Sequence, residues 1–143
     1  MTVEQISVFV ENRPGKLVEV LEILSANNID LRALSIADTA DFGVLRLIVN
    51  KPREALEVLR EADFATSVTE VLAVSIEDAP GSLARVLRYL SDAGIGVEYI
   101  YAFVAHEKDK AYVIVRVEDN EKAAGVLKEK GVTFAKKEDV YTL

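Results

Sequence analysis

The chain contains one sequence unit twice, at a spacing of 66 residues. Residues 11–17 (ENRPGKL) match residues 77–83 (EDAPGSL), and alternating apolar residues precede both segments. Later in the chain the spacing becomes 68, because Val58 matches Val126, so two residues have been added near residues 106–110. A repeat of this length predicts the same supersecondary unit built twice. An insertion is tolerated best at the tip of a hairpin, which we expect near residues 106–110.

Each copy has the periodicities of strand, helix, strand, strand, helix and strand. In the first copy, alternation at Ile6, Val8 and Val10 predicts a strand, and apolar residues at i, i+3, i+4 and i+7 from Leu17 predict an amphipathic helix. Further strands are expected over 31–37, 44–49 and 67–71, and a second helix beginning at Pro52.

This order is the ferredoxin-like split βαβ pattern, in which a four-stranded antiparallel sheet carries two helices on one face. The sequence therefore predicts an α+β fold of two ferredoxin-like βαββαβ units in tandem, over residues 1–70 and 71–143. No Pro, Gly or charge run interrupts residues 68–76, so we expect the two units to be rigidly adjacent.

The sheet face away from the helices is expected to be apolar. Alternation along the strands places these residues there: Phe9, Val44, Arg46, Ile48, Tyr112, Ile114 and Arg116. A sheet with helices on one side is usually polar on the other, and an exposed apolar face marks a partner surface. We therefore predict a homodimer that buries part of this face.

Composition excludes several classes of chemistry. The chain has no Cys and one His, His106, in a charged segment, so we expect no disulfide, thiolate nucleophile, metal site or other cofactor. The formal net charge of −7 disfavours nucleic acid and anionic membranes. Without a signal peptide or a run of 18 apolar residues, the expected location is the cytoplasm. No catalytic constellation is visible, and the sequence predicts a protein that is not an enzyme.

The repeated strand–turn–helix junction is the most informative motif. Pro stiffens the turn, Gly allows close approach of another molecule, and the following helix offers free N–H groups and a positive dipole end. Such a junction can hold a carboxylate. Alternatively, Asn12 and Asp78 cap the helices and Pro-Gly only shapes the turn. The physical chemistry alone leaves both interpretations open.

The two junctions, each followed by a helix and an Asn-Ile or Gly-Ile pair, resemble the ACT domain family. ACT domains are regulatory modules that bind amino acids and are often attached to enzymes of amino-acid metabolism. The resemblance covers essentially the whole chain. The first copy is similar to the regulatory domain of phosphoglycerate dehydrogenase, which carries the same ENRPG. The resemblance implies a ligand between two ACT units that lie side by side. The ligand would contact the loop after the first strand of one unit and the start of a second strand.

The resemblance also implies particular ligand-binding residues. The loop Asn of the family matches Asn12, and a second family Asn matches Asp30, where an acid replaces the amide and can pair with an α-amino group. In the second copy the matching residues are Asp78 and Gly96, so the first copy is the better candidate. Backbone N–H groups are expected from Gly15, Lys16, Leu17, Gly81, Ser82 and Leu83. Arg13 either contacts a carboxylate or is an ordinary surface residue.

The predicted function is that of a regulatory protein. It senses a free amino acid between ACT units and modulates a partner enzyme in trans, since no output domain is visible. The alternative is a structural or assembly subunit that keeps the fold, binds no small molecule and docks an enzyme through its apolar sheet face.

Overall fold

The structure, a computed structural model, describes residues 2–38, 41–104 and 107–142. Its elements follow in the order β1 (Thr2–Glu11), α1 (Lys16–Ala26), β2 (Leu31–Asp38), β3 (Phe42–Val49), α2 (Pro52–Glu61), β4 (Thr66–Glu77), α3 (Ser82–Asp92), β5 (Val97–Ala102), β6 (Lys110–Val117), α4 (Asn120–Glu129), β7 (Thr133–Phe134) and α5 (Lys137–Thr142). The α+β prediction of two tandem βαββαβ units is confirmed. The short helix α5 was not anticipated.

Strand β4 belongs to both units. Its first half pairs antiparallel with β1, from Thr66 to Leu72, and its second half pairs antiparallel with β6, from Leu72 to Glu77. All strands therefore join one curled sheet in the order β2-β3-β1-β4-β6-β5, with β7 also paired to β4. The expected division between residues 70 and 71 falls inside this strand and remains a prediction.

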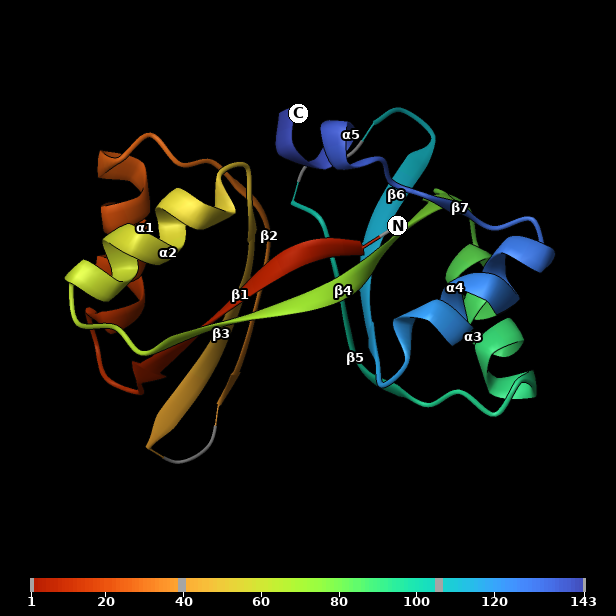
Figure 1. The fold of residues 1–143 in the computed structure, drawn as a ribbon, viewed down its shortest axis with the longest axis horizontal. Coiled ribbons are helices and arrows are strands. Elements are labelled where there is room, and N and C mark those ends of the chain that lie inside the picture. The colour runs from red at the N-terminus through yellow and green to blue at the C-terminus, as the bar shows by residue number, and fades with distance from the viewer. Residues whose placement is uncertain (1, 39–40, 105–106, 143) are drawn as a thin grey trace.

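Each unit has its own core under its own helices. Helices α1 and α2 lie on the outer side of the first unit, and α3 and α4 lie on the outer side of the second, with the strands between them (Figure 1). Fully buried residues such as Ile6 and Leu47 fill the first core, and Leu72 and Leu127 fill the second. These are the apolar positions whose periodicity the two copies share, so the repeat in sequence is a repeat in packing.

A third core lies between the two units. Ile48, Tyr112 and Ile114 are all buried there, together with Val140 of α5. The expectation that the apolar sheet face is open to a partner is therefore wrong for Ile48, Tyr112 and Ile114. The physical reason is that the sheet curls until the two units cover each other's non-helical faces. Phe9 alone in this expected set remains strongly exposed, with 49% of its surface accessible.

The two edge strands of the curled sheet meet at one point. Ala33 of β2 forms an antiparallel bridge with Phe103, just after β5, and the Val104 N–H donates to the Arg32 carbonyl over 2.8 Å. This contact closes one side of the inter-unit core. It also uses the first part of the β2 edge, which then offers fewer free backbone groups to another chain.

A polar cluster crosses the interface between the units. The fully buried Gln5 donates through Nε2 to the Tyr99 hydroxyl over 2.7 Å, and the Tyr101 hydroxyl donates to Gln5 Oε1 over 2.6 Å. The Arg46 guanidinium lies 3.9 Å from the centre of the Tyr99 ring. Burial raises the pKa of Tyr101 above its ordinary 10.0, so its hydroxyl stays a donor into the alkaline range. Because these groups satisfy one another, the cluster fixes one register of the two units.

Candidate functional site

The two strand–turn–helix junctions have the same backbone structure. The Asn12 N–H donates to the Asp41 carbonyl over 2.9 Å, and the Asp78 N–H donates to the Asp109 carbonyl over 3.0 Å. Each loop is thereby anchored near the start of the third strand of its unit. The matching bonds show that the sequence repeat extends to the loop geometry.

Glycine, rather than Asn12 or Asp78, occupies the N-cap of each helix. Gly15 has φ 91° and Gly81 has φ 86°, both in the left-handed region, and neither helix has a side-chain cap. The interpretation that Asn12 and Asp78 cap the helices is therefore wrong. The reason is that the Pro-Gly turn puts the helix start three residues further along the chain. Both side chains are exposed and lie at the helix entrance.

Two of the expected backbone donors are already used within the loops. The Lys16 N–H donates to the Arg13 carbonyl over 3.4 Å, and the Ser82 N–H donates to the Ala79 carbonyl over 3.2 Å. The N–H groups of Leu17 and Leu83 lie in the first helical turn, where no intrahelical acceptor exists. These first-turn groups are the donors that each loop can offer to an anion.

Arg13 is paired within its own loop. Its Nε lies 2.7 Å from Glu11 Oε2, and both side chains are more than half exposed. A surface pair of this kind is weak and screened by salt. The arrangement fits the interpretation of Arg13 as an ordinary surface residue.

Asp30 lies in a polar corner after α1. Its N–H donates to Asn50 Oδ1 over 2.8 Å, and its carboxylate oxygen Oδ2 lies 2.9 Å from Arg32 Nη1. The Arg32 side chain is only 8% exposed, and its buried Nε has no partner. Sequence reasoning missed Arg32, because the irregular pairing between Leu31 and Ala33 that buries it leaves no mark in the alternation.

A single unit does not bring Asn12 and Asp30 together. They lie at opposite ends of the eleven-residue helix α1, which is about 16 Å long. The hollow beside Asn12 is small, about 120 Å³, whereas a groove of about 620 Å³ lies beside Asp30. The same separation applies to Asp78 and Gly96 across α3. One amino acid cannot touch both positions of the same unit.

Neither a metal-binding group nor a membrane-spanning helix occurs among the described residues. No group of three His, Cys, Asp or Glu in the described ranges is arranged to hold a metal ion. His106 lies outside those ranges. None of the helices in the part of the chain described is long and apolar enough to cross a membrane.

Comparison with known proteins gives one family. The family model for an ACT domain pair matches residues 1–143. Among solved structures, protein BT0572 from Bacteroides thetaiotaomicron is 42% identical, with a TM-score of 0.92 over 100% of this chain and 98% of that one. The ligand-free regulatory subunit of aspartate kinase from Thermus thermophilus is 19% identical, with a TM-score of 0.63 over 90% of this chain and 94% of that one. The latter likeness is one of fold. No curated protein matched the sequence.

Proposed function

Because this chain belongs to the ACT domain pair family, we propose that it is a regulatory protein that binds a free amino acid between ACT units and modulates a partner enzyme in trans. The proposal includes no catalytic activity and a cytoplasmic location. The fold it shares with regulatory subunits of aspartate kinase supports a role as a separate regulatory chain.

The observation that carries the proposal is the incomplete site at the first loop. Asn12 is exposed beside a helix whose left-handed Gly15 cap leaves the Leu17 N–H free of any intrahelical partner. A helix entrance with such donors favours a carboxylate. The adjoining hollow of about 120 Å³ covers only part of an amino acid. A second ACT unit is therefore needed to complete the site.

A homodimer supplies that second unit. In the part of the chain described, no strand pairs with the outer edge of β2 beyond Ala33. The far end of β2 is two strands from the loop, because Asp38 pairs with Gly43, and Gly43 pairs with Val10. Antiparallel pairing of two β2 edges would place Asp30 of one copy toward Asn12 of the other. The predicted dimer and the predicted ligand site thus depend on the same contact.

The residues proposed at the site suit the two ends of an amino acid. The first-turn N–H groups and the Asn12 amide face the α-carboxylate, and the Asp30 carboxylate, balanced by Arg32, accepts from the α-ammonium group. The second-unit residues Asp78, Gly81, Ser82 and Leu83 would form a related but unequal site, since Gly96 supplies no side chain.

A thermal-shift screen against the standard amino acids tests the proposal. A ligand that binds only the native dimer at 100 times its Kd adds about 2.7 kcal/mol of stability, so Tm rises by several degrees. We expect Asn12→Ala and Asp30→Ala to abolish the shift. Asn27→Ala, which removes an exposed amide from the other end of α1, is the matched control and should retain it.

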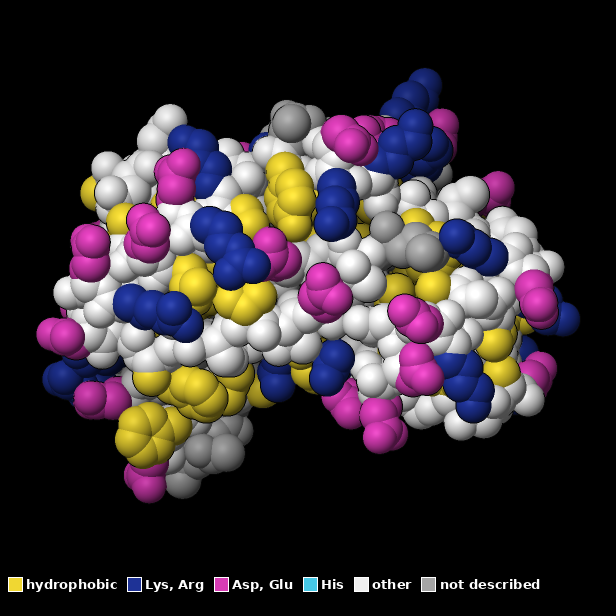
Figure 2. All heavy atoms as spheres, viewed as in Figure 1, with side chains coloured by type: hydrophobic (Ala, Val, Ile, Leu, Met, Phe, Trp, Pro, Cys, Tyr) yellow, Lys and Arg dark blue, Asp and Glu magenta, His cyan; other side chains and the backbone are white. Residues whose placement is uncertain are grey.

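The alternative is an assembly subunit that binds an enzyme and no small molecule. Its support is the exposed apolar surface of the first unit, where Phe9 and Phe42 are 49% and 56% accessible. Figure 2 shows hydrophobic side chains gathered at the lower edge of that unit. If no amino acid raises Tm at millimolar concentration while the protein captures an enzyme of amino-acid metabolism, the assembly role replaces the sensor role.

A further inference from the structure

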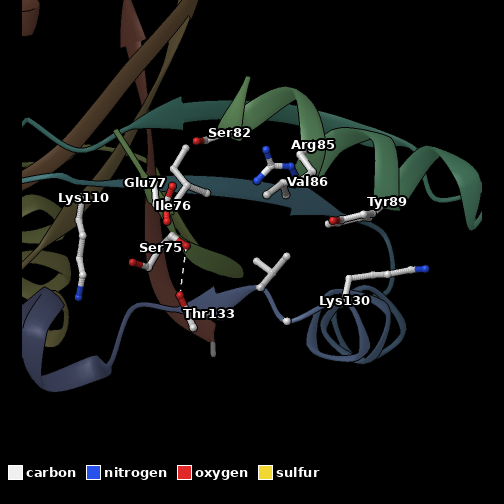
Figure 3. A pocket seen from close by; sticks show the side chains of 12 residues that line it. Ser75, Ile76, Glu77, Ser82, Arg85, Val86, Tyr89, Lys110, Lys130 and Thr133 are labelled. Carbon is white, nitrogen blue, oxygen red and sulfur yellow. Dashed lines mark hydrogen bonds between the residues drawn. The ribbon is translucent and has the colours of Figure 1, made fainter. Parts of the chain in front are cut away.

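A groove of about 450 Å³ lies on the second unit, away from Asp30. Figure 3 shows that it runs between α3, the end of β4 and the segment that enters β7. The Arg85 guanidinium reaches into it from α3, and Lys110 and Lys130 lie at its two ends. Its remaining polar wall includes the buried Ser82 and the hydroxyl of Thr133, which donates to the Ser75 carbonyl over 3.3 Å. We call it the basic groove.

The first unit has the same groove with the opposite charge. All nine residues that line a cavity of about 300 Å³ there match residues of the basic groove at the spacings of 66 and 68. Four exchanges make the lining more positive: Glu19 to Arg85, Phe42 to Lys110, Ala62 to Lys130 and Asp63 to Gly131. One exchange, Lys16 to Ser82, removes a cation. The fold therefore forms a groove at this position in both units. The lining side chains determine whether the groove favours cations or anions.

The charge of the basic groove is only partly balanced by neighbouring residues, since Glu77 lies opposite Lys110 in the pairing of β4 with β6. Arg85, Lys110 and Lys130 form no ion pair with any residue in the described part of the chain, and Glu77 is the one carboxylate of the lining. The lining thus carries three cations and one anion in a protein whose formal net charge is −7. In the first unit the matching lining carries Lys16 against three carboxylates. Positive side chains spaced along a groove of an otherwise acidic protein raise the local concentration of anions.

We propose that the basic groove binds a small organic anion with two or more negative charges, either a phosphomonoester or a dicarboxylate. Arg85 suits either group, because its planar guanidinium forms two parallel hydrogen bonds to carboxylate or phosphate oxygens. The Ser82 hydroxyl on the wall adds a donor, whereas the Thr133 hydroxyl already donates to the Ser75 carbonyl. The partly buried Ile76, Tyr89 and Val132 contact the carbon part of the ligand. The effector of this site differs from the amino acid proposed above, and the inference does not rest on that proposal.

Calorimetric titration of the full-length protein with glycerol 3-phosphate and with succinate, at constant ionic strength, tests this inference. Acetate serves as the monoanion reference, and none of the three probes carries an amino group that the amino-acid site could select. We expect at least one dianion to bind and to shift the amide resonances of Ser82, Arg85 and Gly131. Arg85→Glu, which restores the charge of the first unit, should weaken that binding roughly tenfold or more.

Arg88→Glu is the matched control. It makes the same charge change one turn along α3, where Arg88 faces Asp92 at 3.8 Å outside the groove, and should change affinity by less than about twofold. A stronger response to one dianion identifies the ligand class. The proposal fails if both dianions bind no better than acetate, or if Arg85→Glu and Arg88→Glu weaken binding equally. Asn12→Ala, and Asp78→Ala in the amino-acid site proposed for the same unit as the groove, should leave dianion binding intact, so failure of the amino-acid site would be distinguishable.

Discussion

The two units share a fold but differ in what covers the outer end of their sheets. In the second unit, the chain after β7 returns as α5 and buries Ala135 and Val140 against the inter-unit core. At the corresponding end of the first unit, Phe9 and Phe42 remain largely accessible. In the second unit, α5 thus covers apolar surface of the same chain. In the first unit, an apolar surface stays accessible beside the loop that carries Asn12.

The same contrast extends to the grooves. Matching positions carry Glu19 in one unit and Arg85 in the other, yet the helices beneath them keep equivalent buried residues, Val20 and Val86. Apolar positions facing a core are constrained by packing, and exposed positions are not. The comparison teaches that the repeated unit keeps its buried scaffold while its surface grooves carry opposite charges.

The largest loss of stability is expected where the two units bury their non-helical sheet faces against each other. Ile114→Ala removes a fully buried side chain from the inter-unit core, and we expect the free energy of unfolding to fall by about 2–5 kcal/mol. Urea denaturation followed by circular dichroism measures this. A loss below about 1 kcal/mol would mean that the two faces do not pack against each other.

Phe9→Ala is the comparison variant on the accessible apolar surface of the first unit. Because half of the Phe9 surface is accessible, we expect a loss of about 1 kcal/mol or less for the isolated chain. Because Phe9 lies on β1, two strands from the β2 edge that pairs in the proposed homodimer, the dissociation constant measured by sedimentation should not change. Equal losses of unfolding free energy for Ile114→Ala and Phe9→Ala would contradict the distinction between the buried face with Ile114 and the accessible surface with Phe9.

At the two loops, where the units are alike, we expect a smaller effect than that of Ile114→Ala. Gly15→Ala and Gly81→Ala should each destabilise by about 1–2 kcal/mol, because both positions have φ near 90° and a Cβ is strained there. The added Cβ meets nothing within 4 Å, so the loss comes from the backbone alone. Gly96→Ala, which has no such φ and an equally open surrounding, is the control and should be nearly neutral. Clearly unequal losses at Gly15 and Gly81 would contradict the equivalence of the two loops.

Most of the fold could be predicted because it is determined by local hydrophobic periodicities that occur in both copies of the repeat. The alternation at Ile6, Val8 and Val10 and the helical spacing from Leu17 each identify an element and its buried side, and the uninterrupted residues 68–76 indicated that strand runs into strand. The curl of the sheet could not be predicted. The curl depends on the bridge between Ala33 and Phe103, which are 70 positions apart. This contact does not alter the apolar alternation of either strand, so the sequence pattern does not reveal it.

The site was predictable as a motif and less so as a geometry. The sequence identified the Pro-Gly junctions, but the left-handed φ of Gly15, and hence the N-cap, required the folded loop. Motif matching grouped Asn12 with Asp30, and only the length of α1 separates them within a unit. Arg32 was missed because the irregular pairing that buries it leaves no mark in the alternation. The basic groove was missed because it forms from segments far apart in the chain.

The last expected effect is at the polar cluster that joins the two units, and it depends on pH. Tyr101→Phe removes the hydrogen bond to Gln5 Oε1 and should destabilise by about 1 kcal/mol at pH 7. Burial raises the pKa of Tyr101 above its ordinary 10.0, so the unfolded chain releases the phenol proton before the folded one does. The advantage of the natural protein is therefore complete below pH 10 and declines above it. Denaturation midpoints of the two proteins should converge between pH 10 and 11. Parallel midpoints over that range would mean that this hydroxyl is not buried between the units.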